Sequence, residues 1–96
     1  MAEIYYAAAV ESQKLSLEQL AERFAAAGLP CKIEPEAENM YWLAFESRQS
    51  NVLASVEDGK FVFGTFNFCH DDPSSVAEIV DEVLTSVGFS ADDEAA

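Results

Sequence analysis

The hydrophobic residues between Leu17 and Ala27 recur at the three- and four-residue spacing of an amphipathic helix. Ser16 precedes this segment and Gln19 follows three residues later, which is the pattern of a capping box. Gly28 then occupies a position at which helices commonly end. The sequence therefore predicts a helix from about residue 17 to residue 27 that buries one of its sides.

A second helix is predicted between residues 73 and 87. Asp72 is expected at its N-cap, Pro73 at its first helical position and Gly88 just past its end. Its predicted buried side is wholly aliphatic and consists of Val76, Ile79, Val80, Val83, Leu84 and Val87.

Five segments have the composition or the alternation of β-strands. They span residues 3–10, 31–34, 40–46, 52–57 and 60–68. Asp58 and Gly59 favour a two-residue hairpin turn between the last two. Together with the helices, the order is β-α-β-β-β-β-α. This order predicts an α+β fold, an antiparallel sheet of about five strands with two helices packed on one face and the other face open.

The strand at 40–46 indicates what each face of the sheet carries. Its residues alternate between two sets, Tyr41, Leu43 and Phe45 on one face and Met40, Trp42 and Ala44 on the other. We expect the first set to face the helices, because three large residues match the aliphatic helix surfaces better than a set that contains alanine. Trp42 is then expected on the open face, at a partner or homodimer interface.

The strand at 60–68 does not follow one simple alternation. Its phenylalanines divide into two pairs on opposite faces, Phe61 with Phe63 and Phe66 with Phe68. A bulge at Gly64-Thr65 would bring all four rings to one side, since glycine within a strand often marks a bulge. The alternative is a strand that is buried on both faces.

The composition of the 96 residues supports one hydrophobic core without a metal or a disulfide. Half of them are hydrophobic, and 7 Phe, 3 Tyr and 1 Trp supply large buried groups. We expect residues 1–89 to form a single domain, with Phe89 under the helix end and residues 90–96 as a flexible acidic tail. Without a signal-peptide pattern or a long apolar segment, the prediction is a cytoplasmic protein with reduced Cys31 and Cys69.

The charge is strongly negative and unevenly distributed. The chain has 18 acidic and 5 basic residues, a formal net charge of −13, and no lysine or arginine follows Lys60. Such a protein repels phosphate backbones and anionic membranes, which disfavours direct nucleic-acid binding and membrane binding. The partner that this charge favours is a protein with a basic surface.

Neither a nucleotide-binding glycine motif nor a zinc or calcium motif occurs in the sequence. A thiol triad could consist of Cys69 or Cys31 as nucleophile, His70 as base and Asp71 as orienting residue, and Cys31, Cys69 and His70 could supply three metal ligands. A structural role for these residues is favoured, because a triad normally draws its members from separate elements rather than one tripeptide. We therefore expect no enzymatic activity, no cofactor and no metal.

The second predicted helix carries closely spaced acidic residues without a basic neighbour. Like charges three and four residues apart repel on an exposed helix. The five acids from residue 71 to residue 82 average one per ~3 Å of helix, close to the ~3.4 Å spacing of phosphates along a DNA strand. The candidate partner-binding residues are Asp71, Asp72, Glu78, Asp81, Glu82 and Trp42. The alternative is an acidic face that serves only solubility or adaptation to high salt.

These features favour a non-enzymatic acidic protein-binding module, an inhibitor or antagonist of a basic target such as a nucleic-acid-binding protein. In its charge the chain resembles DNA-mimicking inhibitors, anti-CRISPR proteins and toxin-neutralising immunity proteins, without a family motif. The alternative is a dimeric regulatory protein, similar to a secretion chaperone, that acts through its open sheet face. Those chaperones usually begin with a helix, whereas this chain begins with a predicted strand. A thiol enzyme that uses Cys69 and His70 is the third class.

Overall fold

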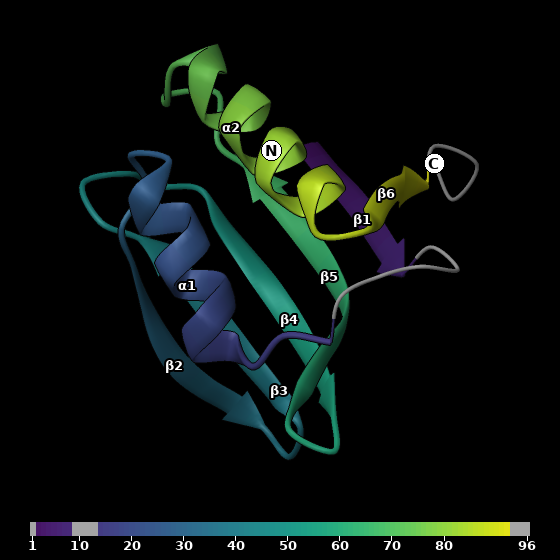
Figure 1. Cartoon of the computed structure of the whole chain (residues 1–96). Helices are drawn as coiled ribbons and strands as arrows, with labels where there is room; N and C mark the ends of the chain where they lie inside the picture. The colour runs from purple at the N-terminus through teal and green to yellow at the C-terminus, as the bar shows by residue number, and fades with distance from the viewer. Residues whose placement is uncertain (1, 9–13, 93–96) are drawn as a thin grey trace.

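The fold combines one sheet with two helices. The computed structural model describes residues 2–8 and 14–92. Its elements, in chain order, are β1 (Ala2–Ala8), α1 (Leu17–Ala26), β2 (Cys31–Ala37), β3 (Met40–Phe45), β4 (Asn51–Glu57), β5 (Lys60–Phe68), α2 (Ser74–Ser86) and β6 (Phe89–Asp92) (Figure 1). The strands form an antiparallel sheet in the order β2-β3-β4-β5-β1-β6. The predicted α+β fold is confirmed, with one strand more than expected.

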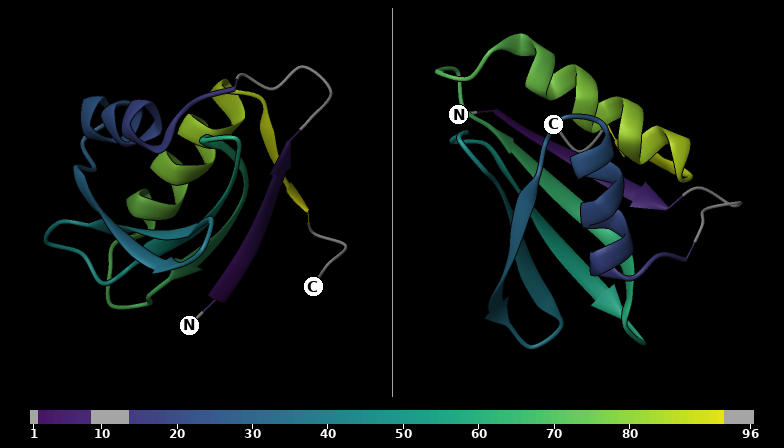
Figure 2. Two further views of the ribbon diagram at one scale, coloured as in Figure 1. Left: turned by 90° about the horizontal axis from the view of Figure 1, so that it is seen from below. Right: turned by 60° about the vertical axis from the view of Figure 1, so that its left-hand side comes forward.

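Both helices lie on the same side of the curved sheet, as Figure 2 shows. The core between the two layers joins the apolar sides of α1 and α2 to the inward residues of the strands. Leu43 and Phe45 of β3 are buried there, and Phe45 meets Phe24 of α1 edge to face with 5.2 Å between ring centroids. The predicted orientation of β3 is therefore confirmed, and Trp42 lies on the open face.

The predicted boundaries of α1 agree with the structure. The Ser16 hydroxyl accepts a hydrogen bond from the Gln19 backbone N–H at 3.2 Å, and the Gln19 side chain accepts one from the Ser16 N–H at 2.9 Å. This capping box satisfies donors that the first helical turn leaves free. Gly28 has a φ of 98°, the left-handed conformation that commonly ends a helix.

The predicted aliphatic side of α2 is buried, but its predicted N-cap is wrong. Pro73, rather than Asp72, occupies the N-cap position, and no side chain caps the helix. The Asp72 carboxylate instead accepts hydrogen bonds from the turn between β3 and β4. A carboxylate gains more from several well-placed donors in this turn than from one N–H of its own helix.

The segment after α2 is more ordered than predicted. Residues 90–92, expected in a flexible tail, belong to β6, which pairs antiparallel with β1. Phe89 is buried, and its ring centroid lies 4.6 Å from that of Phe61. Phe89 anchors the start of β6 in the core, and the edge of β1 supplies hydrogen-bond partners for the backbone that follows. This segment therefore forms a strand. Residues 93–96 of the predicted tail lie outside the described residues.

The bulge in β5 occurs earlier than predicted. Val56 pairs with Phe61 and Ser55 pairs with Phe63, so Val62 is the extra residue. Strict alternation resumes after Phe63. Consequently three of the four phenylalanines face the core side, while Phe63 points to the open face and is 36% exposed.

Gly64 explains why the bulge has this position. It is buried on the core side of β5, and a Cβ added there would lie 2.8 Å from Cζ of Phe61 and 3.2 Å from Cγ1 of Val52. The glycine therefore leaves the space that the Phe61 ring fills. It acts as a packing position next to the bulge rather than as the bulge itself.

We expect Gly64→Ala to lower the free energy of unfolding by about 1–3 kcal/mol, because the added methyl group overlaps the Phe61 ring. Urea denaturation of the full chain measures this change. The variant Gly64→Ala/Phe61→Leu should recover part of the loss, since the smaller side chain vacates the contested space. A Gly64→Ala variant as stable as the parent would show that the ring moves without cost.

Candidate functional site

Asp72, one of the predicted contact residues, connects two loops of the fold. Its carboxylate accepts hydrogen bonds from the backbone N–H of Gln49 at 3.0 Å, and from the N–H and hydroxyl of Ser50 at 2.8 and 2.6 Å. Ser50 is only 1% exposed, and its Oγ also accepts the N–H of Cys69 at 2.9 Å. Asp72 thus holds the β3–β4 turn against the segment that leads into α2.

The pKa of Asp72 reflects these contacts. Burial by itself raises the pKa, but the hydrogen bonds from Ser50 and from the Gln49 and Ser50 N–H groups, with the positive charge of Arg48, lower it below its ordinary value of 3.8. Asp72 is consequently ionised at neutral pH and keeps its negative charge while it performs this structural task.

Asp81 also has an internal partner. It accepts a hydrogen bond of 3.0 Å from the hydroxyl of Tyr6 in β1. Tyr6 is only 2% exposed, and a buried phenol needs a partner for its hydroxyl group. The carboxylate of Asp81 therefore contributes to the attachment of α2 to the sheet, although the residue itself is exposed.

Glu78 and Glu82 are the members of the predicted set that carry no internal hydrogen bond. Both are exposed and lie one helical turn apart on α2. Glu82 also borders a shallow groove between α2 and the end of α1, lined by Ala27, Ile79, Val83 and Ser86. Asp71, the fifth acid, is exposed in the loop before α2 and has only a long contact of 4.0 Å with the Cys69 thiol.

The helical layer carries more acidic than basic residues, since Arg23 is the only lysine or arginine within α1 and α2. Within residues 2–8 and 14–92, the structure contains no ion pair between a carboxylate and a lysine or arginine. In α1, Glu18 and Glu22 add two further exposed carboxylates on the same side of the sheet as Glu78 and Glu82. This layer presents a net negative field to solvent.

The open face of the sheet carries the sixth predicted residue, Trp42. The indole is half-buried although no helix covers it, and its Nε1–H donates a 2.5 Å hydrogen bond to Oε2 of Glu36 in β2. Strand pairing continues from Trp42 to Leu53, then to Thr65 and finally to Tyr5. These four residues therefore form one row across the sheet.

Phe63 lies in the neighbouring row of the open face, opposite Ser55 and Ala7, and was not predicted to lie here. It is the one large hydrophobic side chain that is exposed among the described residues, and it stacks on Tyr5 with 6.2 Å between ring centroids and 25° between ring planes. The exposure of Phe63 was not predicted, because a bulge at Gly64-Thr65 would have put all four phenylalanines on one side of the strand. We call the open-face residues Tyr5, Met40, Trp42, Leu53 and Phe63 the aromatic band.

Cys31, Cys69 and His70 are the residues that the sequence offered for a thiol triad or a metal site. Cys31 is half-buried, and burial, with a smaller contribution from the charge of Glu46, raises its pKa to about 11. The Cys69 thiol contacts Gln49 at 3.6 Å, whereas the exposed His70 ring packs edge to face on Phe68. In the described part of the chain, the structure contains no group of three His, Cys, Asp or Glu side chains that could hold a metal ion.

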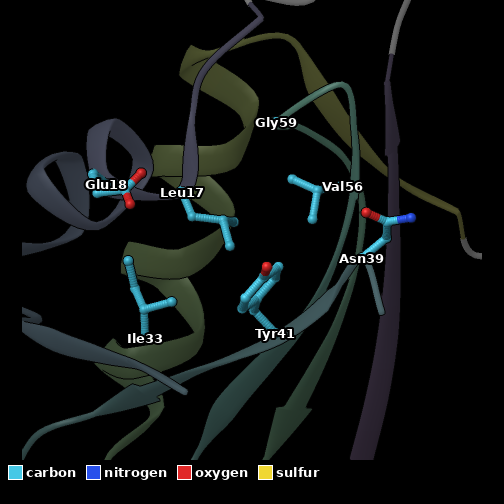
Figure 3. Close-up of a pocket in the computed structure, with 7 residues that line it drawn as sticks. All are labelled: Leu17, Glu18, Ile33, Asn39, Tyr41, Val56 and Gly59. Carbon is cyan, nitrogen blue, oxygen red and sulfur yellow. The ribbon is translucent and has the colours of Figure 1, made fainter. Parts of the chain in front are cut away.

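A cavity of about 250 Å³ lies between the start of α1 and the ends of β2, β3 and β4 (Figure 3). Leu17, Ile33 and Val56 surround the ring of Tyr41 in this cavity, as Figure 3 shows. It is smaller than the roughly 300–1,000 Å³ typical of small-molecule pockets. Its lining contains a carboxylate, Glu18, but no nucleophile beside a base.

None of the described helices is both long and apolar enough to cross a membrane.

Replacing Asp72 with alanine is expected to lower the free energy of unfolding by about 1–2 kcal/mol at pH 7, because buried Ser50 loses its acceptor. The pKa of Asp72 is lower in the folded state, so its contribution is complete above pH 3.8 and is lost as the pH falls through the folded value. Urea denaturation at pH 7 and at pH 2–3 should show the difference between parent and variant shrinking in acid. Asp71→Ala is the control and should change stability by less than ~0.5 kcal/mol. An equal loss in both variants would contradict this role.

Cys31 is expected to react slowly with iodoacetamide at pH 7.5. A pKa of about 11 instead of 9.0 lowers the thiolate fraction about 100-fold, and the higher nucleophilicity of a more basic thiolate restores about tenfold of this loss. In a Cys69→Ser variant, where only Cys31 can react, alkylation followed by mass spectrometry should be at least about tenfold slower in the folded protein than in 8 M urea. Equal rates would show that Cys31 is an accessible, reactive thiol.

Comparisons with known proteins identify no relative whose function could be transferred to this chain. No protein-family model matches the sequence. The searches of curated proteins and of solved structures likewise found no significant match.

Proposed function

We propose that this protein is a non-enzymatic acidic module that binds a basic surface of a partner protein and acts as its inhibitor or antagonist. The observation that carries the proposal is the set of exposed carboxylates on the helical layer that have neither an ion pair nor an internal hydrogen bond. Glu78 and Glu82 on α2 are the clearest members of this set.

The electrostatics of the layer support a basic partner. The chain has a formal net charge of −13, and closely spaced carboxylates repel one another until cations approach them. Lysine and arginine side chains of a partner would relieve this repulsion and steer the encounter. A nucleic-acid-binding groove is one such surface, which is why inhibitors of the DNA-mimic, anti-CRISPR or immunity-protein type fit this charge distribution.

The rigidity of α2 favours this helix as the principal contact. Its aliphatic side is buried in the core, and Asp81 and Asp72 are held at either end of the acidic segment by their hydrogen bonds to Tyr6 and Ser50. The backbone that carries these carboxylates is already ordered, so it loses little conformational entropy when the helix binds a partner. Asp72 and Asp81 thus add fixed charge, while Asp71, Glu78 and Glu82 are free to form new contacts.

The open sheet face favours a second candidate function, a dimeric or regulatory role similar to that of a secretion chaperone. The supporting observation is the aromatic band, with Phe63 exposed and Trp42 half-buried on a face that no helix covers. Apolar residues that remain in contact with water in this way commonly mark an interface.

The proposed contact can be tested by charge reversal on α2. A partner is first captured from the source organism at low salt, and its affinity is then measured for the parent and for Glu78→Lys/Glu82→Lys. We expect about tenfold or greater weakening, because two attractions become repulsions, and we expect association to slow as salt shortens the Debye length from ~10 Å at 0.1 M to ~3 Å at 1 M.

Asp93→Lys/Glu94→Lys is the matched control, since it changes the net charge by the same amount in the C-terminal segment. It should weaken binding by less than about threefold. Circular dichroism establishes that both variants fold. If the α2 variant binds as tightly as the control and salt has no effect on the rate, the acidic layer serves only solubility.

A further inference from the structure

Trp42 and its neighbours form the first of two aromatic-carboxylate sites on the open face. The Glu36 carboxylate accepts the indole N–H at the edge of the ring, so this polar edge is satisfied without covering the ring face. Glu34 lies directly opposite Trp42 in the pairing of β2 with β3, and it is also exposed. A half-buried indole therefore stands beside two carboxylates on an uncovered surface.

The second site lies at the other end of the row. Tyr5 and Phe63 are stacked, and the Tyr5 hydroxyl lies 3.5 Å from Oε2 of Glu3. Phe63 is the more exposed of the two rings. Here again aromatic surface in contact with solvent adjoins a carboxylate.

The register of the sheet fixes the distance between the two sites. Trp42 and Tyr5 belong to the same row and are separated by three strand spacings, with Leu53 and Thr65 between them. At about 4.8 Å per spacing, the sites are about 14 Å apart. In an extended chain, side chains four residues apart on one face are separated by nearly the same distance.

The chemistry of each site suits a guanidinium group. Arginine stacks its planar cation on an aromatic face and donates hydrogen bonds to a neighbouring carboxylate at the same time, whereas lysine offers a compact and strongly hydrated charge. We propose that the open face binds an extended, arginine-bearing segment of the basic partner, with one arginine on Trp42 and another on Tyr5 and Phe63. This inference rests on the proposed function in one respect, namely that the partner is basic.

Charge complementarity favours this occupant over a second copy of the chain. The open face carries more carboxylates than cations, with Glu3, Glu34, Glu36 and Glu57 exposed and with Lys32 and Lys60 as the basic residues of its strands. A homodimer through this face would bring two such surfaces together in molecules of net charge −13. An arginine-bearing segment instead supplies the cations that this surface lacks.

The test uses three synthetic peptides whose terminal charges are removed by N-terminal acetyl and C-terminal amide groups. The first is Gly-Arg-Ser-Thr-Ser-Arg-Gly, in which the arginines are four residues apart, and the others replace both arginines by lysine or by glutamine. Trp42 is the single tryptophan of the chain, so its fluorescence reports directly on the first site. We expect the arginine peptide to bind most tightly, the lysine peptide less tightly and the glutamine peptide least.

Variants then assign the preference to the rings. Trp42→Leu and Tyr5→Leu should each weaken the arginine peptide about two- to fivefold in calorimetric titrations, the factor that corresponds to a solvent-exposed cation–π contact. Trp42→Phe keeps a ring and should retain most of the preference for arginine over lysine. Glu78→Lys/Glu82→Lys is the control on the other side of the molecule, and it should weaken the arginine and lysine peptides by equal factors.

The possible outcomes distinguish failure of the arginine sites from failure of the proposed function. Equal binding of arginine and lysine peptides, unaffected by the ring variants, would overturn the arginine sites and leave the basic partner in place. Equal binding of the glutamine peptide would overturn both, while no binding at millimolar peptide would overturn the arginine sites alone. A parent that sediments as a dimer and becomes monomeric on Trp42→Leu would assign the face to a second copy and so overturn the inference.

Discussion

The aliphatic side of α2 and the apolar side of α1 pack on the same face of a six-stranded sheet, and the rest of the molecule depends on this one-sided packing. The helix-facing side of the sheet contributes Leu43, Phe45, Val52 and Phe66 to the core that the sheet and the two helices form together. The chain has no third helix among its described residues, so the opposite face remains in contact with water. Both surfaces that we propose for partner binding arise from this division, because one is the outer side of the helices and the other is the uncovered side of the sheet.

The aromatic band combines apolar surface with charged groups at its edge. Its two most polar rings, Trp42 and Tyr5, each have a carboxylate at their polar edge. Phe63 has no polar edge and is the most exposed member. An apolar centre with a charged rim is the usual anatomy of a protein interface, so the arrangement suits the proposed binding role.

The acidic residues around α2 perform two tasks that the charge alone does not distinguish. Asp72 and Asp81 stabilise the fold through Ser50 and Tyr6, whereas Glu78 and Glu82 have no such contacts. The structural pair still contributes negative charge at fixed positions. Stability and electrostatic attraction therefore do not compete in this segment, since the carboxylates that hold the helix in place also belong to the acidic surface.

Local patterns in the sequence determined the features that depend on neighbouring residues. The capping box of Ser16 and Gln19, the aliphatic side of α2 and the alternation in β3 each involve residues a few positions apart, and they follow directly from helical and strand periodicity. The hairpin turn at Asp58-Gly59 is equally local, and both of its residues adopt positive φ angles. The composition likewise determined the strong negative charge.

Only the tertiary structure decided the features that depend on distant partners. Asp72 meets Ser50 across 22 residues and Tyr6 meets Asp81 across 75, separations at which no sequence period indicates contact. The bulge at Val62 depends on the space that Gly64 leaves for Phe61, and β6 depends on the free edge of β1. Phe63 reaches the open face for the same reason, because a shift of one residue in register moves a side chain from the core to solvent.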